Sequence, residues 1–162
     1  MKHIYIFSGL GADERVFKYL DFTGFKTTFI TWLQPNDQEP ITQYAKRLTK
    51  QILTSRPILI GLSFGGIIAT EIAKFIDTDK IILIASAKTK FEIPFYYRLA
   101  GHLKIHKLLP IKLMKQPTIF SFWFFGLANK EDKKLLIEIL KDTNEQFLSW
   151  AIGQLVSWKN ET

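Results

Sequence analysis

The feature of the sequence that most constrains its fold is an aliphatic run that passes through a glycine-rich corner into a second apolar segment. Residues 57–62 read PILIGL, and Ser63-Phe64-Gly65-Gly66 leads into an apolar stretch that reaches residue 75. The first run has the length and composition of a strand covered on both faces, and the second is long enough for a helix. Glycine at 61, 65 and 66 leaves room for a tight junction. A strand, a sharp turn and a helix are therefore predicted here.

The first half of the chain repeats this alternation. Strand-like runs also occupy residues 3–7, 27–32 and 80–85, and the last of them is nearly continuous, like 57–62, as expected for a strand covered on both faces. Asp13 can cap a short helix, and Pro40 opens a longer helical pattern whose apolar stripe runs from Ile41 to Ile52. Strands that alternate with helices are typical of a parallel sheet. We predict an α/β fold with a parallel sheet of about four strands flanked by helices.

The pattern changes after residue 85, where only helical segments follow. In the last of them, one face carries Phe147, Leu148, Ala151, Ile152, Leu155 and Trp158, and Asp142 or Thr143 is the expected N-cap. We predict one domain with two regions, an α/β core at 1–88 and a helical region at 89–162.

Composition removes several classes of function. The 162 residues contain no cysteine, which excludes disulfide scaffolds, thiol catalysis and iron–sulfur sites. The net charge of +7 is concentrated after residue 85, where 12 basic residues face 7 acidic ones. No nucleic-acid recognition motif accompanies this charge. The longest apolar stretch, 117–128, is too short to span a membrane, and a cytoplasmic location is expected.

The sharpest chemical signal is Gly61-Leu62-Ser63-Phe64-Gly65, which matches G-x-S-x-G. At a strand-to-helix corner the serine adopts a strained backbone that lifts its hydroxyl clear of the sheet. A second glycine turn, with Gly9 and Gly11, follows the first strand. If the first and third strands are neighbours, the N–H groups of Leu10 and Phe64 can point at one oxygen and form an oxyanion hole.

Three other interpretations of these turns stay open. The spacing around Ser63 can arise by chance, or the sheet can need small residues there for ligand binding without covalent chemistry. Gly9 and Gly11 also begin the dinucleotide pattern G-x-G-x-x-G, but its sixth position is Glu14, whose charge would repel a pyrophosphate.

With these motifs the chain resembles the α/β-hydrolase fold family over residues 1–160. The segments that carry the resemblance are FSGLGADERVF at 7–17, ILIGLSFGG at 58–66 and ILIAS at 82–86. The resemblance implies that Ser63 is a nucleophile and that the N–H groups of Leu10 and Phe64 bind the oxyanion. It also implies a hydrolase of esters, thioesters or amides, with no cofactor or metal, and with residues 89–162 as a cap over the site.

The expected triad partners are harder to find. In such enzymes an acid and then a histidine follow the serine on later loops, but no later strand is predicted here. His3 begins the first strand, at the wrong end of the sheet, whereas His102 and His106 are four residues apart in the helical region. We expect either that the acid and the histidine lie beyond Thr162 in a longer gene product, or that the chain is a non-catalytic relative that binds a small apolar or anionic ligand.

The helical region suggests the substrate. It is rich in aromatic residues, with Phe91, Phe95, Tyr96, Tyr97, Phe120, Phe122, Trp123, Phe124 and Phe125. Some of them are expected to line a pocket for an apolar acyl group above Ser63, the rest being ordinary core. The basic run from Arg98 to Lys115 suits a weak contact with a membrane surface or an acyl carrier, although a solvated helix face is the default explanation.

Overall fold

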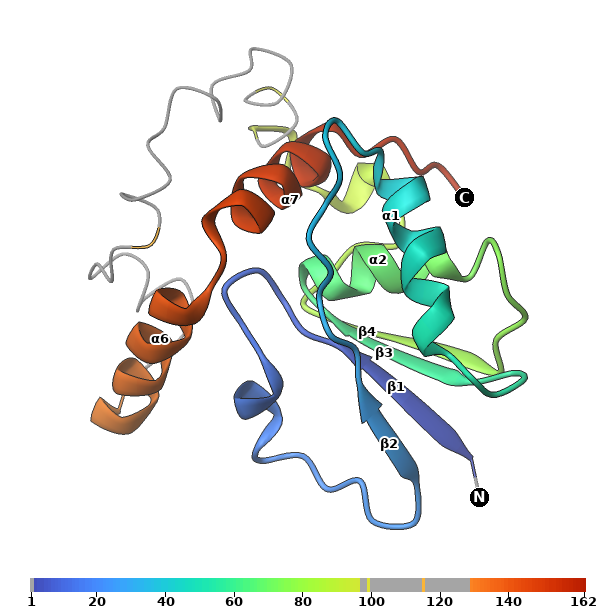
Figure 1. The fold of residues 1–162 in the computed structure, drawn as a ribbon, viewed down its shortest axis with the longest axis horizontal. Helices are drawn as coiled ribbons and strands as arrows, with labels where there is room; N and C mark the ends of the chain where they lie inside the picture. Colours follow the sequence, from blue (N-terminus) through green and yellow to red (C-terminus); the bar gives the residue numbers. More distant parts are fainter. Residues whose placement is uncertain (1, 97–98, 100–114, 116–128) are drawn as a thin grey trace.

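The computed structural model describes residues 2–96, 99, 115 and 129–162. Their centre is a parallel sheet of four strands in the order β2-β1-β3-β4 (Figure 1). The strands are β1 (His3–Phe7), β2 (Lys26–Phe29), β3 (Ile58–Leu62) and β4 (Lys80–Ile84). The helices are α1 (Ile41–Leu48), α2 (Phe64–Ile72), α6 (Lys130–Asp142) and α7 (Glu145–Ser157), with 3₁₀ turns η1 (Glu14–Phe17), η2 (Thr49–Gln51) and η3 (Lys90–Glu92). The predicted fold class is confirmed.

Strand register brings the two glycine turns together. β1 pairs with β3 in parallel, so that Ile4 lies opposite Ile58 and Phe7 opposite Gly61. The turn after Phe7 and the turn after Leu62 therefore leave the sheet at the same edge. The condition for the predicted oxyanion hole, that the first and third strands are neighbours, is therefore met.

The two faces of the sheet are covered differently. On one face, Tyr5, Phe7 and Leu59 pack in a large core with side chains of α1, α2 and α7, and Figure 1 shows these three helices on the same side of the sheet. On the other face, Ile4, Ile6, Ile58 and Ile60 form a smaller cluster with Phe17 of η1. The helix α7, although distant in sequence, thus shares its core with the first half of the chain.

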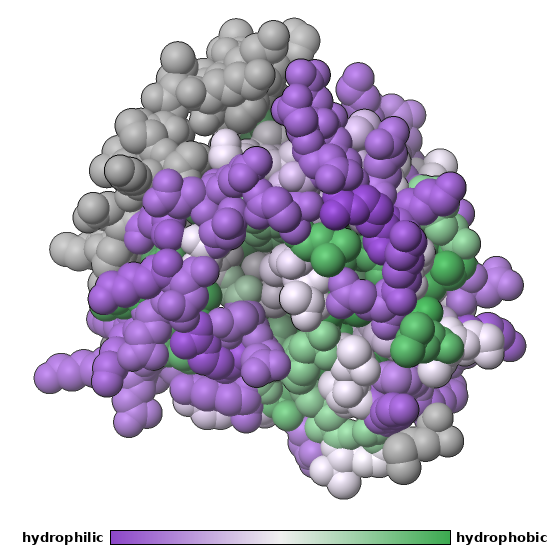
Figure 2. Space-filling model, viewed as in Figure 1, coloured by the Kyte–Doolittle hydropathy of each residue, from purple (hydrophilic) through white to green (hydrophobic). Residues whose placement is uncertain are grey.

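The prediction that the fourth strand is covered on both faces, like the third, is wrong. β3 is a central strand, but β4 lies at the edge of the described sheet, and the side chain of Ile82 is 39% exposed. An aliphatic run shows that a strand is apolar, but it does not show how much of its surface other segments cover. Figure 2 shows patches of exposed hydrophobic residues on a face of the molecule that is otherwise mainly hydrophilic.

Two boundaries also differ from the sequence prediction. β2 ends at Phe29 rather than at residue 32, because the Thr31 backbone pairs with the side chain of Gln51 instead of a strand. The N-cap of α7 is Asn144, whose side chain accepts a hydrogen bond from Phe147 N–H, and neither Asp142 nor Thr143 has this role. Asn, Asp and Thr are all good capping residues, so the sequence did not distinguish them.

Among the described residues, no helix has the length and apolar character needed to cross a membrane.

Candidate active site

Ser63 occupies the corner between β3 and α2. Its φ of 51° and ψ of −119° lie in a region that residues other than glycine rarely adopt. The corner is held by hydrogen bonds from Ser63 N–H to Ile84 O at 2.8 Å and from Ser86 Oγ to Ser63 O at 2.6 Å. Ser63 is exposed although β3 below it is buried. The backbone therefore presents the Ser63 side chain outside the sheet.

Three glycines make this corner sterically possible. A Cβ on Gly61 would lie 2.3 Å from Gly66 Cα, and one on Gly66 would lie 2.3 Å from Ser86 Oγ. A Cβ on Gly65 would lie 2.3 Å from the carbonyl oxygens of both Phe7 and Ser8. Since real Cβ atoms do not approach other atoms so closely, each position requires glycine. The short distances from Gly65 to Phe7 and Ser8 also show that the start of α2 packs directly on the end of β1.

The first glycine turn lies against Ser63. A Cβ on Gly9 would be 3.3 Å from Ser63 Cβ, so the two turns are in near contact. Gly11 has a φ of +61°, and Ala12 N–H donates to Gly9 O at 3.2 Å. Glycine is the residue that adopts this left-handed conformation without strain.

Two backbone donors remain unused at this junction. Within residues 2–96 and 129–162, neither the N–H of Leu10 nor that of Phe64 has a hydrogen-bond partner. Phe64 is the first residue of α2, where the helix dipole favours negative charge. Such donors suit an oxygen that gains negative charge.

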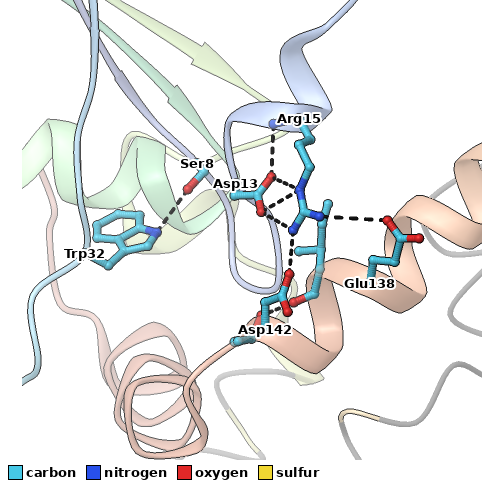
Figure 3. A network of polar contacts seen from close by, with 8 residues as sticks. Ser8, Asp13, Arg15, Trp32, Glu138 and Asp142 are labelled. Atoms are coloured by element: carbon cyan, nitrogen blue, oxygen red, sulfur yellow. Dashed lines mark hydrogen bonds and ion pairs between the residues drawn. The ribbon is translucent and has the colours of Figure 1, made fainter.

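The helix α6 covers the glycine turn. Leu140 Cδ2 lies 3.0 Å from the position of a Cβ on Gly11. Figure 3 shows Arg15 of η1 between Asp13 and the α6 residues Glu138 and Asp142. Its guanidinium contacts Asp13 at 2.6 Å, Asp142 at 3.0 Å and Glu138 at 3.9 Å. Hydrogen bonding to Asp13 and Asp142 raises the pKa of Arg15 above its ordinary range.

Asp13 caps η1, as the sequence predicts, by accepting a hydrogen bond from Arg15 N–H. Partial burial opposes ionisation of this carboxyl, but hydrogen bonds from Arg15 outweigh it, and the pKa of Asp13 is lowered. Sequence analysis missed the remainder of the network, because Arg15 and its partners on α6 are more than 120 residues apart in the chain.

In the described part of the chain, no histidine or carboxylate is hydrogen-bonded to Ser63 Oγ. Ser63 Oγ forms no hydrogen bond there. His3 stands at the opposite end of the sheet, where it stacks on Tyr5 and bonds to Thr28. Burial, followed by repulsion from Lys26, lowers the pKa of His3. His102 and His106 lie outside the described residues.

The other candidate sites considered, metal clusters and surface hollows, do not include Ser63. The described residues contain no cluster of three or more potential metal ligands. A hollow of about 480 Å³ is lined by Glu71, Lys74 and residues 157–162, and another of about 400 Å³ by residues 35–38 and α7.

Of the aromatic residues expected above the site, Phe91, Phe95 and Tyr96 are more than half exposed, and the others lie outside the described residues.

Comparisons with known proteins identify the fold. No protein-family model matches the chain, and no curated protein matches it by sequence. Solved structures do match, including a carboxylesterase from the archaeon Nitrososphaera gargenis (18% identity, TM-score 0.66, 98% of this chain). MenH from S. aureus matches with 16% identity and a TM-score of 0.69 over 96% of this chain. RedJ thioesterase from Streptomyces coelicolor matches with 14% identity and a TM-score of 0.62 over 99%. The chain has the α/β-hydrolase fold, and it spans 65% to 67% of the length of these three proteins.

Proposed function

We propose that this chain carries the nucleophile of a serine hydrolase of the α/β-hydrolase type, acting on an ester or thioester. The observation that supports this most is the strained backbone of Ser63 at a strand-to-helix corner, beside a second turn with an unused N–H. Backbone strain of about 1–3 kcal/mol persists where the surrounding structure enforces it, and it is concentrated at functional sites.

In the proposed reaction Ser63 Oγ attacks the carbonyl carbon of the substrate while a general base accepts its proton. The carbonyl oxygen becomes an oxyanion, which the N–H groups of Leu10 and Phe64 stabilise. Collapse expels the alcohol or thiol, which takes up a proton, and leaves an acyl group on Ser63. Water then hydrolyses this acyl-enzyme to the acid and free Ser63. The base is a histidine outside the described residues.

A fluorophosphonate probe tests the nucleophile. We expect the complete protein, with its general base, to be labelled at one site, and Ser63→Ala to abolish labelling. Ser149→Ala is the matched control, because Ser149 is an exposed serine on α7, and it should label like the wild type. Absence of labelling in correctly folded wild-type protein would contradict the proposal and favour a non-catalytic binding protein of the same fold. The observation that favours this second candidate is that Ser63 Oγ is not hydrogen-bonded to a base among the described residues.

The substrate class follows from the surroundings of the turn. Leu140 of α6 lies 3.0 Å from the position of a Cβ on Gly11, so the contact of α6 with the turn beside Ser63 includes an apolar side chain. We therefore propose a small-molecule substrate with an apolar acyl group. Across p-nitrophenyl esters, kcat/KM should rise from acetate to medium-chain acyl groups, and equal or faster turnover of acetate would contradict this. A weak contact of the basic run with an acyl carrier or a membrane surface, and a cytoplasmic location, stay predictions.

A further inference from the structure

Trp32 connects the core to the first glycine turn. It lies three residues after β2, and its indole Nε1–H donates a hydrogen bond of 3.0 Å to Ser8 Oγ (Figure 3). Ser8 is the first residue after β1 and is only 6% exposed. Burial of a hydroxyl is costly unless it is hydrogen-bonded, so this contact stabilises Ser8 in its position.

The position of Ser8 determines where the glycine turn lies relative to Ser63. The Ser8 carbonyl oxygen occupies the space beside Gly65, and Gly9 follows immediately against Ser63 Cβ. Within the turn, Ala12 N–H to Gly9 O is a local hydrogen bond that does not connect the turn to the core. The Ser8 side chain does make such a connection, two residues before the Leu10 N–H.

Trp32 is itself fixed by an aromatic cluster. Its ring centroid lies 5.3 Å from Phe147, stacked, and 6.1 Å and 6.5 Å from Phe64 and Tyr44. Phe147 belongs to α7, Tyr44 to α1 and Phe64 to the first turn of α2. Three helices therefore determine where the indole N–H points.

We propose that Trp32 is a positioning residue for the reaction, which aligns the Leu10 N–H with Ser63 by holding Ser8. This inference rests on the proposed function, because the aligned donor is the proposed oxyanion donor. Displacement of a catalytic group by about 1 Å can lower a rate by about 100-fold, so one side-chain hydrogen bond at this place has kinetic consequences.

The test compares Trp32→Phe, Ser8→Ala and the double variant in the protein. Phenylalanine keeps an aromatic ring in the cluster and removes the donor, and alanine removes the acceptor. We expect each single variant to lower kcat, and the rate of inactivation by the fluorophosphonate, by about 10-fold to 100-fold with little change in KM. The double variant should be no slower than the slower single variant, since both break one hydrogen bond.

Trp150→Phe is the matched control. Trp150 lies in the same cluster, 6.0 Å from Phe147, and its Nε1–H donates to Glu39 O at 2.7 Å rather than to the glycine turn. This variant loses a comparable hydrogen bond and should keep the wild-type kcat. Equal losses of kcat in Trp32→Phe and Trp150→Phe, or no loss in Trp32→Phe, would overturn the inference.

Hydrogen exchange at the turn separates this inference from the proposed function. We expect Trp32→Phe to accelerate exchange of the Ala12 amide, which is bonded to Gly9 O, and Trp150→Phe to leave it unchanged. If the wild type does not label but exchange responds in this way, the hydrolase proposal fails and Trp32 keeps only a structural role in holding the turn. If labelling depends on Ser63 but neither exchange nor kcat responds to Trp32→Phe, only the positioning role fails.

Discussion

At the scale of single residues, Ser63 has a backbone that is suited to its proposed chemistry rather than to stability. Its positive φ is costly for any residue with a Cβ, and the closely packed glycines around it leave the chain no alternative path. The G-x-S-x-G spacing made this residue predictable from sequence, because the serine and the three glycines that the corner requires lie within six consecutive residues, whereas the contacts from Phe7, Ser8 and Ser86 became visible only in the fold.

Replacement of Ser63 should reveal this strain. We expect Ser63→Gly to be about 1 kcal/mol more stable to unfolding than Ser63→Ala, because glycine tolerates a φ of 51° and alanine does not. At Ser149, within the helix α7, the order should reverse, with glycine about 1 kcal/mol less stable than alanine. Urea denaturation of the four variants measures both differences. If alanine is more stable than glycine at both positions, backbone strain at Ser63 is contradicted.

The hydrogen bond of Trp32 to Ser8 could not be predicted from local sequence spacing. Its partner Ser8 is 24 residues away, and the strand pattern placed Trp32 inside a strand, although β2 ends at Phe29. A tryptophan in a strand-like run is normally a core residue, so only the fold discloses the hydrogen bond that its indole makes.

At the scale of elements, Arg15 joins η1 to α6 across the glycine turn. Lys18 of the same region also pairs with Asp132 at the start of α6, at 3.0 Å. All these side chains are partly exposed, so each pair is expected to contribute no more than about 1 kcal/mol. Their arrangement holds Leu140 over Gly11 and thus affects the immediate surroundings of Ser63.

The ion pair between Asp13 and Arg15 makes the stability of the protein depend on pH. Its pKa is lowered in the folded state, so its ionised form stabilises the fold above its ordinary pKa and the contribution is lost as pH falls through the folded value. Asp13→Asn keeps a side chain that can cap η1 but removes the charge. We expect this variant to be less stable than the wild type by about 0.5–1 kcal/mol at pH 7, with the difference vanishing towards pH 2. Urea titrations across this range check it, and a difference independent of pH would contradict the ionic contribution.

At the scale of the whole molecule, α7 is part of the central core and not a separate layer. Phe147 and Ala151 are buried with residues of β1, α1 and α2. The sequence identified the apolar face of this helix from its spacing, but it did not show which surface that face contacts. It likewise identified β4 as a strand from its aliphatic run, but not the exposure of Ile82, because that depends on which distant segments pack on the strand.

This shared core predicts that the described elements unfold together. Phe147→Ala should lower the free energy of unfolding by about 3–4 kcal/mol, because it leaves a cavity among Trp32, Tyr44 and Phe64. Phe91→Ala should have little effect, since Phe91 is 65% exposed. Far-ultraviolet circular dichroism and tryptophan fluorescence should give coincident transitions, and an earlier separate transition of the helical signal would contradict a common core.

The aromatic cluster also gives the molecule an optical reporter of its own site. Trp32 and Trp150 both lie about 6 Å or less from Phe147, and Trp32 is bonded to the residue that begins the glycine turn. Rings held at fixed angles in an asymmetric environment produce near-ultraviolet circular dichroism, a signal that is lost when specific packing is lost. The geometry of the turn beside Ser63 can thus be followed spectroscopically, without substrate, from the absorption of the protein's own indoles.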